Sequence, residues 1–100
     1  MPRPKRVRSV DCPPVATYYK PQGIPMKELE EVTLSIDEFE AIRLVDAEAH
    51  SREEAAQMMS VSQPTLCRIL ASARSSIASA LANGKALRID GGHYIVKKDQ

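Results

Sequence analysis

Four polar side chains lie close together at the predicted start of a helix: Ser62, Gln63, Thr65 and Arg68. Their chemistry is hydrogen-bonded recognition, because glutamine pairs with the edge of adenine, arginine with that of guanine, and serine or threonine with a base or a phosphate. The backbone amides at a helix N-terminus also attract phosphate. These residue types at this spacing predict contacts with a nucleic-acid duplex.

A second set of candidate contacts lies near the N-terminus. Residues 1–14 contain four prolines and four basic residues, which are Arg3, Lys5, Arg6 and Arg8. Proline lacks an N–H group and biases the preceding residue toward extended backbone, so this segment is predicted to be an arm. Arms of this kind lie in the minor groove or along phosphates in other DNA-binding folds. The alternative is a solvated tail without a partner. Arg74 and Lys85 are weaker candidates for phosphate contacts.

The remaining reactive side chains predict neither an enzyme nor a metal site. The possible metal ligands lack the close pairs typical of zinc sites: Cys12, His50, Cys67 and His93. Gly91 and Gly92 are too few for a phosphate-binding loop. Asp37, Glu38 and Glu40 are expected on the water-facing side of a helix, not as a catalytic pair. We therefore expect no catalytic activity, no cofactor and no bound metal.

Length, composition and charge are those of one small globular domain. The chain has 100 residues, of which 43% are hydrophobic and 27% charged, and its net charge is +1. Basic residues are in excess over residues 1–20 and 61–100, whereas residues 21–60 contain ten acids and three basic residues. Basic ends of this kind offer a polyanion one positive face. The sequence has neither an apolar run that could span a membrane nor a secretory signal, so we expect a cytoplasmic protein.

Three helices are predicted, and each begins at a serine cap. Ser35 and Ser51 each start an S-x-x-E capping box, which places helices at about 36–48 and 52–59. The third helix follows the N-cap Ser62 and ends at Asn83-Gly84, at about 63–82. A short helix, a tight break and a longer helix form a helix-turn-helix. Its turn often has a glycine with left-handed backbone, and here that position falls on Ser60.

Short β elements are predicted on both sides of these helices. Residues 15–19 are β-branched and aromatic enough for a strand, and residues 86–89 and 93–96 flank a glycine turn that predicts a C-terminal hairpin at about 86–96. The expected fold is therefore mainly α, with a helix-turn-helix core in one domain at 15–96 and a frayed tail at 97–100. The apolar end of the third helix needs a cover, and dimers read two half-sites, so we expect a homodimer.

The chain also resembles a known family in five segments that cover about residues 1–95: MPRPKR, TYYKPQGIP, ELEEVTLSIDEFEAIRLVD, EEAAQMMSVSQPTLCRILASAR and NGKALRIDGG. They resemble the domain-of-unknown-function family one-three-four, small prokaryotic proteins described as predicted DNA-binding proteins with a helix-turn-helix like sigma-factor region four. The resemblance implies sequence-specific binding of double-stranded DNA and regulation of transcription. Members often have cysteines near the start of the chain, where this sequence has only Cys12.

Two other interpretations remain open from the sequence. The acidic stretch at 28–54 fits a protein-interaction module that docks on the transcription machinery, and such a module predicts no salt-sensitive DNA binding. A redox- or metal-responsive regulator would use Cys12 and Cys67, and it predicts DNA affinity that changes on oxidation.

Overall fold

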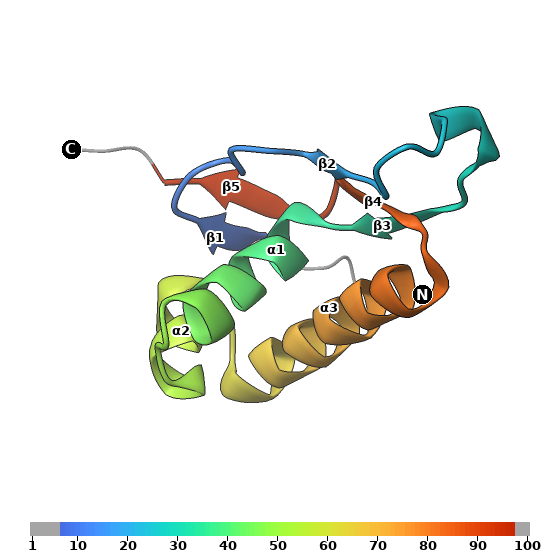
Figure 1. The fold of residues 1–100 in the computed structure, drawn as a ribbon. Coiled ribbons are helices and arrows are strands. Elements are labelled where there is room, and N and C mark those ends of the chain that lie inside the picture. The colour runs from blue at the N-terminus through green and yellow to red at the C-terminus, as the bar shows by residue number, and fades with distance from the viewer. Residues whose placement is uncertain (1–6, 98–100) are drawn as a thin grey trace, which may run out of the picture.

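Three α-helices pack against a layer of short strands in the computed structural model, which describes residues 7–97 (Figure 1). The helices are α1 (Ile36–Ile42), α2 (Arg52–Met58) and α3 (Gln63–Asn83). A π-helical segment, Arg43–Ala47, continues α1. The three helices expected from the sequence are therefore confirmed, with bounds that differ by one residue at most when the π-helical segment is counted with the first helix. None of the helices within residues 7–97 is long and apolar enough to cross a membrane.

The helix ends follow from local hydrogen bonds that the sequence specifies. The Ser35 hydroxyl accepts the Glu38 amide at 3.3 Å, and the Glu38 carboxylate accepts the Ser35 amide at 2.9 Å. Ser51 and Glu54 repeat this box at 3.0 and 2.9 Å. Gly84 ends α3 with left-handed backbone at φ 63°, as a C-terminal glycine commonly does. Because each cap involves neighbouring residues only, its sequence signature is sufficient to predict it.

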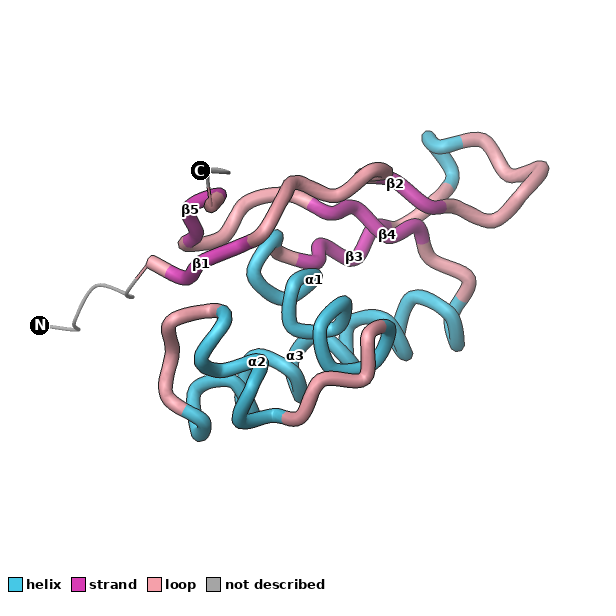
Figure 2. Tube along the Cα trace, turned by 90° about the vertical axis from the view of Figure 1, so that its left-hand side faces the viewer, coloured by secondary structure: helices cyan, strands magenta, loops and turns pink. Residues whose placement is uncertain are grey.

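Within residues 7–97, five short strands form two sheets above the helices (Figure 2). The strands are β1 (Arg8–Val10), β2 (Tyr18–Tyr19), β3 (Glu31–Leu34), β4 (Ala86–Ile89) and β5 (Tyr94–Val96). In the larger sheet β4 is central, antiparallel to β2 and parallel to β3. In the smaller sheet β1 and β5 pair in parallel. A 3-10 turn, Met26–Glu28, precedes β3.

The predicted C-terminal hairpin is wrong in its pairing. The two strands exist, but β4 pairs with β2 and β3 while β5 pairs with β1. Gly91 and Gly92, with φ 76° and 105°, lead the chain past the start of α1, where the Ile36 amide donates to the Gly91 carbonyl at 2.8 Å. The glycines therefore make a crossing between two sheets, not a hairpin turn. A glycine signal sets local backbone geometry, and the pairing partner depends on distant segments.

The predicted arm also differs from the structure in its second half. Residues 8–10 form β1, and the Val10 side chain is completely buried. The expected strand at 15–19 is reduced to β2, and β3 was not predicted. Arg3, Lys5 and Arg6 lie outside the described residues. Residues 8–10 of the predicted arm therefore pack with the rest of the fold.

The core has two apolar clusters that meet along α3. One joins the three helices through residues that include Leu44, Met59 and Leu66. The other lies between the strands and the middle of α3 and includes Val10, Leu34, Ile36, Ala73 and Ile89. The first cluster fixes the angle between α2 and α3, and the second fixes α3 to the strand layer.

Two acids expected to face water are buried instead. Asp37 is 6% exposed and Glu40 only 1%. The Glu40 carboxylate accepts two hydrogen bonds from the Arg43 guanidinium, at 2.8 and 2.9 Å, and one from the Asp11 amide at 2.9 Å. This pairing raises the pKa of Arg43 further above its ordinary value. The expectation failed because β1 and the segment after it cover this side of α1, which the helical pattern alone does not reveal.

Candidate nucleic-acid interface

Helices α2 and α3 are joined by a short turn, in the order of short helix, tight break and longer helix that the sequence predicts. The buried side chains of Ala56 and Met59 pack where the helices approach each other, and the Val61 amide donates to the Ala56 carbonyl at 3.0 Å. Ser60 has φ 59°, so the left-handed position falls on the serine as expected. A residue other than glycine at this backbone angle costs about 1–2 kcal/mol, which the surrounding packing offsets.

The structure brings together the four polar residues expected at the start of α3. The Ser62 hydroxyl caps the helix by accepting the Thr65 amide at 3.2 Å, and it donates to the Thr65 hydroxyl at 2.9 Å. The Arg68 guanidinium donates to the same Thr65 oxygen at 3.3 Å. Gln63 and Arg68 are exposed, whereas Thr65 is half-buried. Ser62 and Thr65 therefore organise the helix start, and Gln63 and Arg68 are the side chains that face outward.

Along α3 the exposed residues follow a helical repeat. Pro64, Cys67, Arg68, Ala71 and Ser75 are all exposed, and successive members are separated by at most four residues. Because residues three and four apart lie on one side of a helix, they form a continuous face. The opposite side of α3 contributes its buried leucines and isoleucine to the core. Small side chains surround Arg68 on this face, and Gln63, Ser72 and Arg74 of α3 are exposed beside it.

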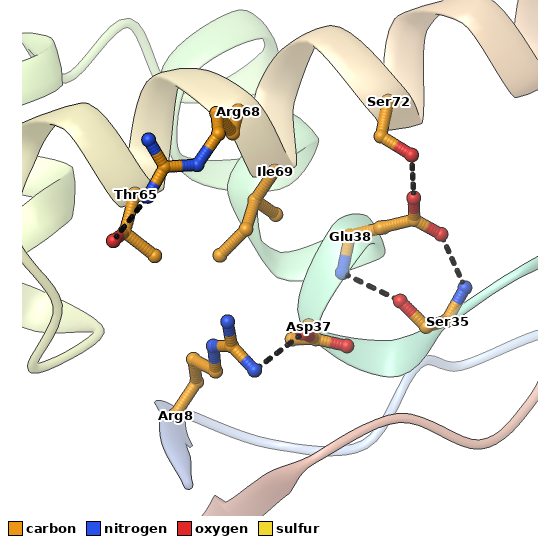
Figure 3. A pocket seen from close by; sticks show the side chains of 8 residues that line it. All are labelled: Arg8, Ser35, Asp37, Glu38, Thr65, Arg68, Ile69 and Ser72. Carbon is orange, nitrogen blue, oxygen red and sulfur yellow. Dashed lines mark hydrogen bonds and ion pairs between the residues drawn. The ribbon is translucent and has the colours of Figure 1, made fainter. Parts of the chain in front are cut away.

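Arg8 belongs to the same region although the sequence places it in the arm. It lines a pocket of about 540 Å³ with Thr65, Arg68, Ile69 and Ser72 of α3 and with residues at the start of α1 (Figure 3). The Arg8 side chain is 11% exposed, and its guanidinium lies 3.9 Å from the Asp37 carboxylate. The sequence offered no signal for this position, because strand pairing over more than 80 residues creates it.

The two weaker candidates are already paired with acids. Arg74 donates to Asp46 through two nitrogens, at 2.7 and 3.1 Å, which lowers the pKa of Asp46 and raises that of Arg74. Lys85 lies 3.3 Å from the Glu30 carboxylate. Both positive charges are therefore partly neutralised within the chain.

Comparison with known proteins identifies the family. The sequence profile described as "Protein of unknown function DUF134" matches residues 1–97. The chain belongs to this family. It is 56% identical over 96 residues to a UPF0251 protein of Caldanaerobacter subterraneus subsp. tengcongensis, with coverage of 96% of this chain and 81% of that protein. It is 51% identical over 100 residues to a UPF0251 protein of Thermoanaerobacter sp. strain X514, with coverage of 100% and 88%. No solved structure matches the chain.

The cysteines of this DUF134 protein are both exposed thiols. Cys12 follows β1, and Cys67 lies beside Arg68 on the outward face of α3. They are not joined by a disulfide. Within residues 7–97, no cluster of three or more histidine, cysteine or acidic side chains has the geometry of a metal site.

Proposed function

We propose that this DUF134 protein binds double-stranded DNA sequence-specifically and regulates transcription, with α3 in the major groove. The supporting observation is the exposed face at the first turns of α3, which presents Gln63 and Arg68 from a helix-turn-helix. A major groove about 12 Å wide admits an α-helix, whose diameter with side chains is about 10–12 Å. In this class of proteins the N-terminal residues of the second helix contact the bases.

The attachment of β1 supports a role for the N-terminal basic residues in the same interface. The Ser9 amide donates to the Met59 carbonyl at 2.9 Å, and the Ser9 and Ser60 hydroxyls are 3.1 Å apart. Strand β1, which directly follows the N-terminal basic residues, is therefore attached to the turn between α2 and α3. Arg3 is five residues before Arg8, so its Cα lies within about 19 Å of that of Arg8 in any conformation. Such residues would add phosphate contacts beside α3.

The experiment that tests the proposal is selection of bound sequences from a random pool of duplexes. We expect an enriched palindrome, and Gln63→Ala should weaken binding to it by about 1–3 kcal/mol and relax the preference at one adenine position. The matched control is Gln22→Ala, an exposed glutamine in the loop after β2, which should bind like the wild type. Equal binding of all duplexes by wild type and Gln63→Ala would contradict sequence-specific recognition.

A separate variant tests the arm. Replacing Arg3, Lys5 and Arg6 by glutamine leaves β1 intact, which a deletion of residues 2–8 would not. If all three contact phosphates, the slope of log affinity against log salt concentration should decrease by up to about 2.7. An unchanged affinity and slope would show that the arm does not contribute.

The expected homodimer and the cytoplasmic location are parts of the same proposal. A palindromic site requires two copies, and an apolar groove of about 410 Å³ lies at the far end of α3, lined by residues that include Tyr19, Ile77, Leu81 and Leu87. The Leu81 side chain is 80% exposed there. We propose that a second copy of the chain covers it.

The alternative interpretations predict different outcomes of the binding measurement. A module that docks on the transcription machinery would show no salt-sensitive binding to any duplex. A redox-responsive regulator would lose or gain affinity on oxidation, and Cys67→Ser would abolish that change while Cys12→Ser would report on the second thiol.

A further inference from the structure

The charged groups that line the pocket beside α3 lie on two sides, with Arg8, its neighbour Asp37 and Arg68 on one side and Glu38 on the other. Figure 3 shows the guanidinium groups of Arg8 and Arg68 at one end, and Glu38 with Ser35 and Ser72 at the other. Both Glu38 oxygens are engaged, because one accepts the Ser35 amide at 2.9 Å and the other accepts the Ser72 hydroxyl at 2.5 Å. The acid at the far end is thus held within the fold.

Arg8 is held rigidly but is not fully satisfied. Its amide donates to the His93 carbonyl at 2.9 Å, and the next residue is bonded to the helix-turn-helix turn. The guanidinium is 3.9 Å from Asp37, which is longer than a hydrogen bond, and within the described part of the chain neither the buried Arg8 Nε nor the buried Asp37 Oδ1 has a hydrogen-bond partner. A guanidinium has five N–H donors, so Arg8 can donate hydrogen bonds to an additional anionic partner.

Arg68 points toward the same space. Its hydrogen bond to the Thr65 hydroxyl directs the guanidinium along the flank of α3 that borders the pocket (Figure 3). Two arginines from elements 60 residues apart in the sequence therefore flank one opening. Guanidinium groups match phosphate oxygens in a bidentate geometry, and two of them suit one tetrahedral anion.

We propose that Arg8 and Arg68 together hold one phosphate group of the DNA backbone at the edge of the groove that α3 enters. This inference rests on the proposed function and assigns Arg68 to phosphate binding, in place of the guanine contact expected from the sequence. Gln63 is then the base-reading side chain. The phosphate contact sets the position of α3 on the duplex, as backbone contacts do.

The test is a scan of the selected duplex with neutral methylphosphonates, one backbone position at a time. In the wild type we expect at least about a tenfold loss of affinity at the phosphate held by the two arginines. Arg68→Gln should reduce that loss to less than about threefold at the same position. Because loss of Arg8 leaves Asp37 buried and unpaired, the second variant combines Arg8→Gln with Asp37→Asn. It should likewise reduce the loss of affinity at the same backbone position to less than about threefold.

Arg88→Gln is the matched control, because it removes one positive charge from β4 and should leave the scan unchanged. If the two test variants reduce the methylphosphonate effect at different backbone positions, or at none, the shared phosphate is refuted while the proposed function stands. If no duplex binds at all, the proposed function fails.

The pocket is then tested by NMR, in which inorganic phosphate is added and the Nε–Hε signals of both arginines are followed. Joint shifts would indicate a site for a free phosphate and overturn the DNA assignment, and the absence of shifts would overturn the pocket itself.

Discussion

Two neighbouring glycines provide a sharp test of how the strand crossing supports the candidate site. Gly92 has φ 105°, and a Cβ atom there would lie 2.3 Å from an oxygen of Asp37 and 3.0 Å from the Cβ of Ser35. Gly91 also has a positive φ, 76°, but an added Cβ would meet no atom within 4 Å. Replacing each glycine by alanine therefore separates the effect of backbone angle from that of close packing.

The expected difference follows from these two terms. An alanine at positive φ destabilises the folded state by about 1–2 kcal/mol. Alanine also lowers the conformational entropy of the unfolded chain, which offsets about 0.4–1 kcal/mol of that loss. Gly91→Ala should thus lower the free energy of unfolding by about 1 kcal/mol. Gly92→Ala adds an overlap with the buried Asp37, and forced overpacking costs about 1–3 kcal/mol. We expect a total loss of about 3 kcal/mol.

Urea unfolding followed by circular dichroism measures both values, and thermal unfolding should show Gly92→Ala melting about 10 °C below Gly91→Ala. Asp37→Ala should cost less stability in the Gly92→Ala background than in the wild type, because the overlapping oxygen is then absent while the loss of the Arg8 partner is common to both. Equal destabilisation by the two glycine variants would show that Gly92 does not pack on Asp37, and the position assigned to Arg8 would lose its support.

Three further predictions concern the turn, the apolar groove and pH. In a Ser9→Ala background, which removes the hydroxyl contact, Ser60→Gly should raise the free energy of unfolding by about 1 kcal/mol, since φ 59° suits glycine; urea unfolding that shows no gain would contradict this. We expect light scattering to give the mass of the proposed dimer for the wild type and of a monomer for Leu81→Glu, without loss of helicity; a monomeric wild type would refute the dimer, and a dimeric variant would exclude this groove as the interface. Hydrogen bonds from Arg74 lower the pKa of Asp46 below its ordinary value of 3.8, so the stability they give is present above that value and is lost as the pH falls through the lowered pKa. The difference in urea midpoint between wild type and Asp46→Asn should therefore vanish in acid, and a difference that grows in acid would contradict the assignment.

The parts of the fold that the sequence predicts are those fixed by neighbouring residues. The start of each helix can be predicted from its capping serine, because a cap and its partner are only three residues apart; these serines are Ser35, Ser51 and Ser62. The left-handed turn residue could be assigned to Ser60 because the break between two helical patterns leaves few positions for it. The candidate contacts Gln63 and Arg68 follow from the same local pattern, since the apolar repeat of α3 defines which side is exposed.

The parts that the sequence does not predict depend on pairing between distant segments. β4 has two partners, one antiparallel and one parallel, and its own residues carry no signal for either. Glu40 lies at a helical position that reads as solvent-exposed, yet a segment 29 residues earlier in the chain covers it and donates a hydrogen bond. Arg8 has the same character, because an arginine in a proline-rich segment looks like part of a mobile tail until a strand partner is known.

The location of Arg8 changes how the candidate interface should be understood. In a helix-turn-helix considered alone, the candidate DNA contacts all come from one short segment, the polar start of the second helix. Here β1 is bonded both to the turn at Met59 and Ser60 and to β5, so the strand layer is connected to the start of α3. Asp37 lies between the crossing at Gly92 and the Arg8 guanidinium and is close to both. The strands, which are the least predictable elements from the sequence, therefore determine whether the second arginine lies beside the first.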